Sequence, residues 1–172
     1  FYLSTILDDY SRYIIAWKLC TTMRADDVTE TLKLALQASG CDRVEVVHKP
    51  RLLSDNGSSY IAGDLADWLI DQGMAHVRGA PNHPQTQGKI ERWHQTLKNR
   101  VLLENYYLPS DLETRIGAFV ERYNHRRYHE SLGNLTPADV DFGRHRTIID
   151  RRRKIKDLTI RTRRLAHQCQ AA

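Results

Sequence analysis

Two carboxylates occupy positions where they could hold divalent metal ions together. Asp55 directly follows the strand candidate at 51–54 and opens the turn Asp55-Asn56-Gly57, and Glu91 follows with 35 residues between the two. Hard cations such as Mg²⁺ and Mn²⁺ prefer carboxylate oxygens, and phosphoryl transfer uses two such ions about 3.5 to 4 Å apart. Most Asp and Glu side chains are only solvated surface charges, so two carboxylates alone are weak evidence for a metal site. Their spacing and the surrounding segments strengthen it.

The segments around these carboxylates alternate between strand and helix patterns, which predicts an α/β fold with helices on the faces of a sheet. Strands are predicted at 2–7 and 13–19 as a hairpin, at 51–54 and at 74–77, with a minor candidate at 44–47. Helices are predicted from Asp26 to Gly40, with Val28, Leu32, Ala35 and Leu36 inward, and at 64–72, with Leu65, Trp68 and Leu69 inward. Asp55 is therefore placed at the carboxyl end of a strand.

The second half of the chain is predicted to be helical. A polar loop at 78–87 leads into a long helix from about Gly88, whose buried stripe is Ile90, Trp93, Leu97 and Val101. Glu91 lies just off this stripe in the first turn, so it can converge with Asp55 on one edge of the sheet. Residues 110–113 read as the capping box of the next helix, and Thr136-Pro137 as the start of a short helix that ends by Gly143.

Composition and charge are those of a globular chain with a basic tail. The 172 residues suffice for one domain plus an appendage, predicted here as a core at 1–143 and an extension at 144–172. Residues 144–164 hold ten of the 26 Lys and Arg but only two of the 21 acids. Such a tail fits a polyanion partner or a solvated, fraying terminus, and both interpretations stay open.

Several classes of protein are disfavoured by what the sequence lacks. The three cysteines are far apart, which indicates neither a disulfide framework nor a zinc cluster and fits a reducing, intracellular location. No apolar run is long enough to span a membrane. The sequence also lacks the Gly-x-x-x-x-Gly-Lys loop that binds the phosphates of ATP, so ATP use is not indicated. The chain begins with Phe1 rather than Met, so we expect it to be a piece of a longer protein.

Three linked motifs resemble the retroviral integrase superfamily and, within it, the bacterial insertion-sequence transposases. They are Leu53–Ser58, Ala80–Arg92 and Tyr123–His129, the last followed by Leu132 and Thr136-Pro137. The resemblance spans almost the whole chain, and the 35-residue gap matches the family pattern of Asp, Asp, 35 residues, Glu. It implies a ribonuclease H-like mixed sheet flanked by helices, here with a helical basic C-terminal extension.

The resemblance also implies a polynucleotidyl transferase that cleaves DNA 3′ ends and transfers them to target DNA. Asp55 matches the family's second catalytic carboxylate and Glu91 its third, and both would bind Mg²⁺ or Mn²⁺ in a two-metal site. The first carboxylate is expected on a strand upstream of Phe1, so this piece is expected to be inactive. Asp8 and Asp9 are interpreted as turn-forming or hydrogen-bonding groups.

The expected partners are the DNA ends of a mobile element and target DNA. Joining two ends concertedly makes a homodimer or higher homo-oligomer a reasonable expectation, on DNA in the nucleoid. Lys98 lies about two turns after Glu91 on the same helix face and Gln95 about one turn after it, so each either contacts DNA or is a solvated surface group.

Asn82, His83 and Gln87 lie in a polar loop before the Glu91 helix. This loop could close over substrate or could simply be a mobile surface loop.

Three other readings concern aromatic and histidine residues and the overall activity. Trp68 and Trp93 are expected in the core, and the cluster Tyr123–His129 is expected to be structural, with DNA contact as the second reading and no zinc site. A nuclease that only hydrolyses DNA and a noncatalytic DNA-binding relic are the rival functions. The retention of all three motifs argues against the relic.

Overall fold

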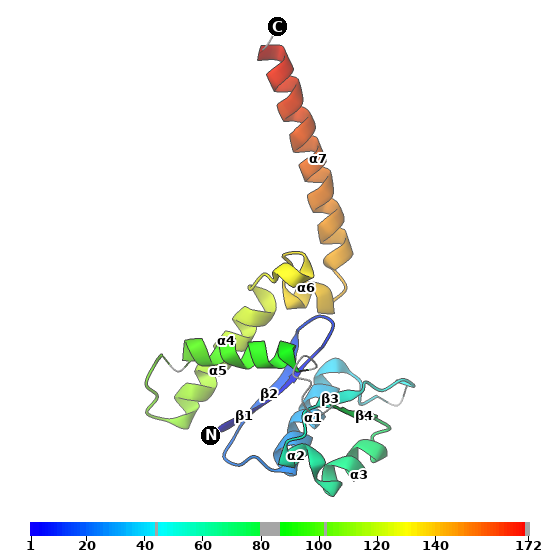
Figure 1. The fold of residues 1–172 in the computed structure, drawn as a ribbon, viewed down its shortest axis with the longest axis vertical. Helices are drawn as coiled ribbons and strands as arrows, with labels where there is room; N and C mark the ends of the chain where they lie inside the picture. The colour runs from blue at the N-terminus through cyan, green and yellow to red at the C-terminus, as the bar shows by residue number, and fades with distance from the viewer. Residues whose placement is uncertain (44, 80–86, 102, 171–172) are drawn as a thin grey trace. The chain divides into compact units, whose positions relative to one another are not determined.

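Residues 1–43, 45–79, 87–101 and 103–170 are described by the structure, a computed structural model shown in Figure 1. The chain forms two compact units, Phe1–Glu121 and Arg122–Ala172. The division into a core and a basic extension at residue 143 stays a prediction. In the described part of the chain, no helix has the length and apolar character needed to cross a membrane.

The first unit begins with the predicted hairpin. Strands β1 (Tyr2–Leu7) and β2 (Ile14–Cys20) pair antiparallel, with Tyr2 opposite Cys20 and an irregularity between Ile6 and Leu7. The Asp8 carboxylate Oδ2 accepts hydrogen bonds from the backbone N–H groups of Tyr10, at 3.1 Å, and Ser11, at 2.6 Å. These bonds tighten the connection between the strands, so Asp8 forms the turn as predicted.

Helix α1 (Ala25–Ser39) supplies the centre of the hydrophobic core. Its predicted inward residues Val28, Leu32, Ala35 and Leu36 are all buried, and the helix ends at Gly40, whose φ of 68° is the left-handed conformation that favours glycine. These apolar side chains recur at helical spacing, so one face packs against Leu52, Leu65, Leu69 and Met74. Thr31 is also fully buried, which was not predicted. Its hydroxyl donates a hydrogen bond to the Asp27 carbonyl at 2.8 Å, so this polar group is satisfied inside the core.

The second sheet places Asp55. Strands β3 (Leu52–Ser54) and β4 (His76–Arg78) pair parallel, and the connection between them contains α2 (Ser58–Ile61) and α3 (Gly63–Asp71). Leu65 and Leu69 of α3 are buried as predicted, whereas Trp68 is only partly buried. The strand predicted at 74–77 begins two residues later than expected, and α2 was not predicted.

One strand prediction was wrong in its described part. Residues 45–47 belong to no strand, and Val44 lies outside the described residues. Val47 is 84% exposed, so its β-branched side chain has no sheet to pack against and its strand propensity is overridden.

Helix α4 (Gly88–Val101) and most of α5 (Pro109–His125) belong to the first unit, and the last four residues of α5 belong to the second. Trp93, Leu97 and Val101 are buried as predicted, and the Trp93 ring lies 5.6 Å from the Phe119 ring between centroids. The capping-box prediction for residues 110–113 was wrong, because α5 begins at Pro109 and Ser110 lies inside its first turn. The fixed φ of proline suits the first helical position, which moves the start of the helix upstream.

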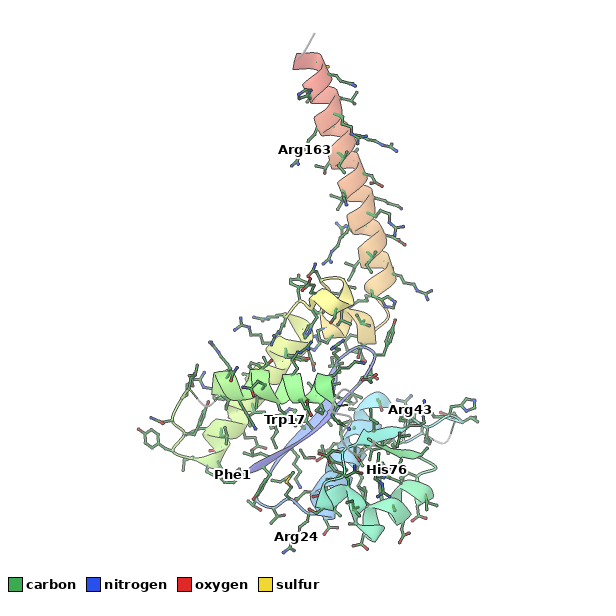
Figure 2. The ribbon with its side chains drawn as sticks, in the orientation of Figure 1. Phe1, Trp17, Arg24, Arg43, His76 and Arg163 are labelled. Atoms are coloured by element: carbon green, nitrogen blue, oxygen red, sulfur yellow. The ribbon has the colours of Figure 1, made fainter. Side chains whose placement is uncertain are left out.

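The second unit contains a short turn and two further helices. A 3₁₀ turn at Glu130–Leu132 precedes α6 (Pro137–Asp141), which Thr136 caps as predicted by accepting a hydrogen bond from the Asp139 backbone N–H at 3.2 Å. The Tyr123 ring meets the His129 ring edge-on at 5.0 Å, a packing contact that fits the structural reading of this cluster. Helix α7 (His145–Gln170) is the predicted helical extension, and Figure 2 shows its side chains, Arg163 among them, on all sides of the helix.

Candidate active site

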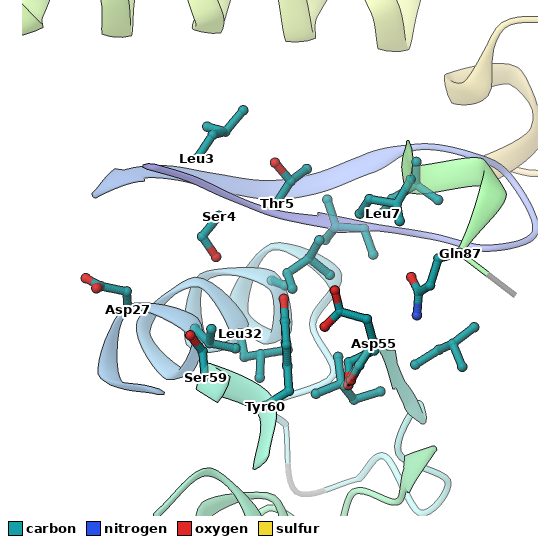
Figure 3. Close-up of a pocket in the computed structure, with 18 of the residues that line it drawn as sticks. Leu3, Ser4, Thr5, Leu7, Asp27, Leu32, Asp55, Ser59, Tyr60 and Gln87 are labelled. Atoms are coloured by element: carbon teal, nitrogen blue, oxygen red, sulfur yellow. The ribbon is translucent and has the colours of Figure 1, made fainter. Parts of the chain in front are cut away.

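A cavity of about 600 Å³ in the first unit brings the two predicted carboxylates together. Its walls come from β1, the segment around β3, α1 and the first turns of α4, and both Asp55 and Glu91 line it. Figure 3 shows Asp55 and Tyr60 directed into this cavity beneath β1. Asp55 and Glu91, which have 35 residues between them in the sequence, therefore line the same cavity. Their roles as metal ligands stay predictions.

Asp55 is held in place by the turn that follows it. Its Oδ1 accepts a hydrogen bond from the Gly57 backbone N–H at 2.9 Å, and Asn56 Nδ2 donates to the Gly79 carbonyl at 3.0 Å. A Cβ atom added at Gly57 would lie 3.0 Å from Asp55 Oδ1, which is tighter than real Cβ contacts tolerate without movement. Asn56 and Gly57 thus support the carboxylate, and Oδ2 has no hydrogen-bond donor among the described residues.

Glu91 lies in the first turn of α4, where the partial positive charge of the helix N-terminus favours a carboxylate. Its backbone N–H donates to the Gln87 carbonyl at 3.0 Å, and its side chain is exposed. The same turn is tied to the hairpin through Lys89, whose Nζ lies 2.7 Å from Asp9 Oδ1 and donates to the Asp9 carbonyl at 2.8 Å. The Lys89 contacts fix the position from which Glu91 projects.

Asp8 and Asp9 also line the cavity, but both carboxylates already have partners. Asp8 accepts the two turn hydrogen bonds described above, and Asp9 is paired with Lys89. Among the described residues, no group of three or more His, Cys, Asp or Glu side chains is arranged to hold a metal ion. A further lining acid, Asp27, accepts hydrogen bonds from the Thr22 hydroxyl at 2.6 Å and the Arg24 backbone N–H at 3.1 Å. Among the described residues, Asp55 and Glu91 are thus the lining carboxylates that are engaged least by other groups of the protein.

Neighbouring side chains are shaped by burial and by the Asp55 charge. Burial raises the pKa of the Tyr60 phenol above its ordinary value, and the negative charge of Asp55 raises it further. Behind Asp55, the Ser54 hydroxyl and His76 Nε2 form a hydrogen bond of 2.8 Å that links β3 to β4. Burial lowers the pKa of His76, and the Arg78 charge lowers it further, so the imidazole is kept neutral near pH 7.

His94 belongs to this site, although it was not predicted from the sequence. His94 lines the cavity, three residues after Glu91 and thus on a neighbouring part of the same helix face. Burial lowers its pKa, with a smaller effect of the same sign from Lys98. Its Nε2 is buried and has no hydrogen-bond partner among the described residues. The spacing from Glu91 was the signal that could have identified it.

The remaining predicted residues fall outside the cavity or outside the described residues. Lys98 and Gln95 are exposed and absent from the cavity lining, and Gln95 Nε2 donates to Asn99 Oδ1 at 2.7 Å. Gln87 does line the cavity, whereas Asn82 and His83 lie outside the described residues. DNA contacts by Lys98 and Gln95 therefore stay predictions, and they would lie on the surface of α4 outside the cavity.

Comparison with known proteins agrees with this architecture. Two family models, both described as Integrase core domain, match residues 1–84 and 72–137. The transposase for insertion sequence element IS629 of Shigella sonnei is 26% identical over 144 residues, which are 81% of this chain and 46% of that protein. The chain spans about half the length of the curated relatives it matches.

Solved structures show the same fold at low sequence identity. A simian T-cell lymphotropic virus intasome, in complex with the PP2A regulatory subunit B56 gamma, aligns with a TM-score of 0.67 at 18% identity, covering 81% of this chain and 47% of that one. The HTLV-2 integrase catalytic core domain in complex with magnesium aligns with a TM-score of 0.62 at 15% identity, covering 81% and 83%. The predicted ribonuclease H-like α/β fold is confirmed, and the chain belongs to the integrase core domain family of the retroviral integrase superfamily.

Proposed function

We propose that this chain is the catalytic core of a DNA transposase or integrase that cleaves the 3′ ends of a mobile element and joins them to target DNA. The observation that carries the proposal is the convergence of Asp55 and Glu91 on one cavity, with the family's 35-residue gap between them. The substrates are the element's DNA ends and the target DNA, and the protein acts on them inside the cell as a homodimer or higher homo-oligomer.

The donor chemistry of the cavity fits a divalent cation. Both carboxylates are exposed, Asp55 keeps one oxygen clear of the Gly57 hydrogen bond, and hard cations such as Mg²⁺ and Mn²⁺ prefer such oxygens. Asp55 and Glu91 would hold the metal ions, and when bound these ions supply Lewis-acid stabilisation of charge on the transferred phosphate. The magnesium complex of the HTLV-2 core, a protein of the same fold, supports this choice.

The contribution of the chain itself is position and charge. The Gly57 backbone N–H orients Asp55, and the Lys89–Asp9 pair fixes the helix turn that carries Glu91. A DNA phosphodiester held beside these carboxylates can be attacked in line, first by water and then by the freed 3′ hydroxyl. One phosphodiester replaces another in the joining step, so neither a covalent enzyme intermediate nor ATP is required.

The first catalytic carboxylate is proposed to come from a strand that precedes Phe1 in a longer protein. Every residue of β1 and of β3 lines the cavity, although successive side chains of a strand point to opposite faces, so both strands present a backbone edge to it. Among the described residues, β1 pairs only with β2 and β3 only with β4. A strand between these edges would carry its side chains close to Asp55, and without it we expect the chain to be inactive.

The test is Mn²⁺-dependent joining of a pre-cut DNA end to target DNA. The 172-residue chain is compared with a longer chain that extends upstream through the additional strand. We expect joining only by the longer chain. Robust joining by the shorter chain, lost on Asp8→Asn or Asp9→Asn, would instead place the first carboxylate in the hairpin turn.

The same experiment separates the rival functions. A nuclease of this fold would cut DNA but leave a supplied 3′ hydroxyl end unjoined. A noncatalytic DNA-binding module would bind DNA without cutting or joining it, even as the longer chain with Mn²⁺ present. The hydrogen bonds of the turn after Asp55 favour the transferase over the noncatalytic module, because a DNA-binding module would not need a turn that orients this carboxylate.

A further inference from the structure

The backbone of Asp55 is held by the side chain that precedes it. The Ser54 hydroxyl donates a hydrogen bond to the Asp55 carbonyl at 2.9 Å, and Ser54 is only 4% exposed. The Ser54 carbonyl in turn accepts a hydrogen bond from the Gly79 backbone N–H at 2.9 Å. Buried polar groups are almost always paired, and each of these pairs restricts the backbone at the end of β3. Ser54 therefore helps to set the direction in which the strand end presents Asp55.

His76 is the residue that orients the Ser54 hydroxyl. Its Nε2 lies 2.8 Å from Ser54 Oγ, across the parallel pair of β3 and β4. A serine hydroxyl has a single proton, and here that proton is directed to the Asp55 carbonyl. Ser54 Oγ must therefore accept a hydrogen bond from His76, which assigns the imidazole proton to Nε2. The hydrogen bonds run in one direction, from His76 through Ser54 to the backbone of Asp55.

We propose that His76 is a positioning residue for strand transfer, which acts on Asp55 through the Ser54 hydroxyl. Within the described residues, His76 is not part of the cavity lining, so its contribution is indirect. The Gly57 backbone N–H fixes the Asp55 side chain, and the Ser54 hydroxyl fixes the Asp55 backbone. A displacement of about 1 Å at a catalytic group can cost about a hundredfold in rate, so both supports matter for catalysis. The inference rests on the proposed function of Asp55.

The chemistry of the donor selects the variants that test this role. Glutamine presents its Nε2 the same number of bonds from Cβ as histidine does, so His76→Gln keeps a donor for Ser54 Oγ. Asparagine has its nitrogen one bond closer to Cβ, at the place of the histidine Nδ1, and leucine has no donor at all. A role that depended only on filling space would not distinguish glutamine from leucine.

Strand transfer by the full-length protein is measured for the three variants at position 76. We expect His76→Leu to lower kcat by about tenfold or more, His76→Asn to behave in the same way, and His76→Gln to keep most of the activity. The affinity for DNA should not change, because His76 lies outside the cavity lining. The matched control is His48→Leu, the same substitution at an exposed histidine that does not line the cavity.

Two further measurements test the route through Ser54. The variant that combines His76→Leu with Ser54→Ala should lose no more activity than Ser54→Ala alone, because residues that act as one unit are not additive. Calorimetric titration of Mn²⁺ into the full-length protein bound to uncleaved DNA gives a readout that does not depend on turnover. Mn²⁺ binding should weaken in His76→Leu and recover in His76→Gln.

Equal strand transfer by His76→Leu and His76→Gln would overturn the inference, and so would losses that multiply in the combined variant. If His76→Leu does not fold, His76→Asn and His76→Gln decide by the same comparison. Asp55→Asn separates this result from the proposed function. An active Asp55→Asn protein would refute the role of Asp55 itself, whereas an inactive one beside equal variants at position 76 would refute only the role of His76.

Discussion

Lys89 joins the first turn of α4 to Asp9 in the hairpin turn, with its Nζ 2.7 Å from Asp9 Oδ1 and 2.8 Å from the Asp9 carbonyl oxygen. The pair positions Glu91 two residues later. We predict that Lys89→Met lowers strand transfer by the full-length protein by about tenfold or more, because a misplaced catalytic group costs rate steeply. The melting temperature should change little, since exposed ion pairs contribute roughly 0 to 1 kcal/mol.

Asp9→Asn provides the matched control for this contact. If Asp9 only holds Lys89, its amide oxygen and backbone carbonyl preserve part of the contact, and activity should fall less than in Lys89→Met. A complete loss of activity in Asp9→Asn, together with near-normal activity in Lys89→Met, would show that Asp9 acts as a metal ligand instead.

The turn after Asp55 gives a second prediction. Gly57→Ala places a methyl group 3.0 Å from Asp55 Oδ1, so the carboxylate must move and strand transfer should fall by about tenfold. Gly63→Ala is the control, because its added Cβ meets no atom within 4 Å. Assays of strand transfer and thermal unfolding should show an activity loss in the first variant alone, with both proteins folded. Equal activity of the two variants would remove the proposed support of Asp55 by this turn.

Local rules explain which elements could be predicted from the sequence. The hairpin and α1 follow from residue periodicity and from the stop at Gly40, which depend on neighbours a few residues apart. Asp55 was placed correctly at the end of β3, because the short strand candidate at 51–54 and the Asp-Asn-Gly turn that follows it are both local signals. The start of α5 was misplaced because two local signals compete, and Pro109 at the first helical position prevails over the capping pattern at Ser110.

Contacts between distant segments explain what could not be predicted. The pairing of Lys89 with Asp9 joins residues 80 positions apart, and no pattern within either segment indicates the other. Likewise, the lack of a strand at 45–47 depends on the absence of a neighbouring sheet rather than on the Val residues themselves. The convergence of Asp55 and Glu91 was anticipated from their places at a strand end and in the first turn of a helix, and the family resemblance supported it. The contribution of His94 to the same cavity, by contrast, required the packing of α4.

The two histidines with lowered pKa predict how stability depends on pH. His76 and His94 are kept neutral by burial, so below their ordinary pKa of about 6.5 the unfolded chain binds protons that the folded chain does not. Their contribution to stability is complete above pH 6.5 and is lost as the pH falls through the lowered folded values. We expect the melting temperature to drop by a few degrees between pH 7 and pH 5.

A double variant isolates this effect. His76→Asn with His94→Gln should flatten the pH dependence of the melting temperature, while replacement of the exposed His48 by Asn should leave it unchanged. A pH dependence that survives in the double variant would assign the acid sensitivity to other groups.

The basic tail is predicted to supply sequence-independent affinity for DNA through counterion release. Ten Lys and Arg residues lie within 144–164, and log K falls with log salt concentration by about 0.9 for each phosphate neutralised. Truncation after Gly143 should weaken DNA binding and flatten this dependence, measured by titration at several salt concentrations. Arg163→Gln with Arg164→Gln removes two of these ten charges and should reduce the slope by less than the truncation does. An unchanged slope after truncation would mean that the tail is a solvated extension.

Strand transfer by the full-length protein tests whether Asp55 and Glu91 are catalytic carboxylates. Asp55→Asn and Glu91→Gln each remove one negative charge from the cavity with almost no change in shape, while the exposed side chains contribute little to folding. Asp64→Asn, an exposed acid of α3 that does not line the cavity, is the control. We predict that both cavity variants lose strand transfer in Mg²⁺ and Mn²⁺ while they keep the thermal unfolding of the original protein and the control stays active. Activity within a fewfold of the original in either cavity variant would contradict the assignment.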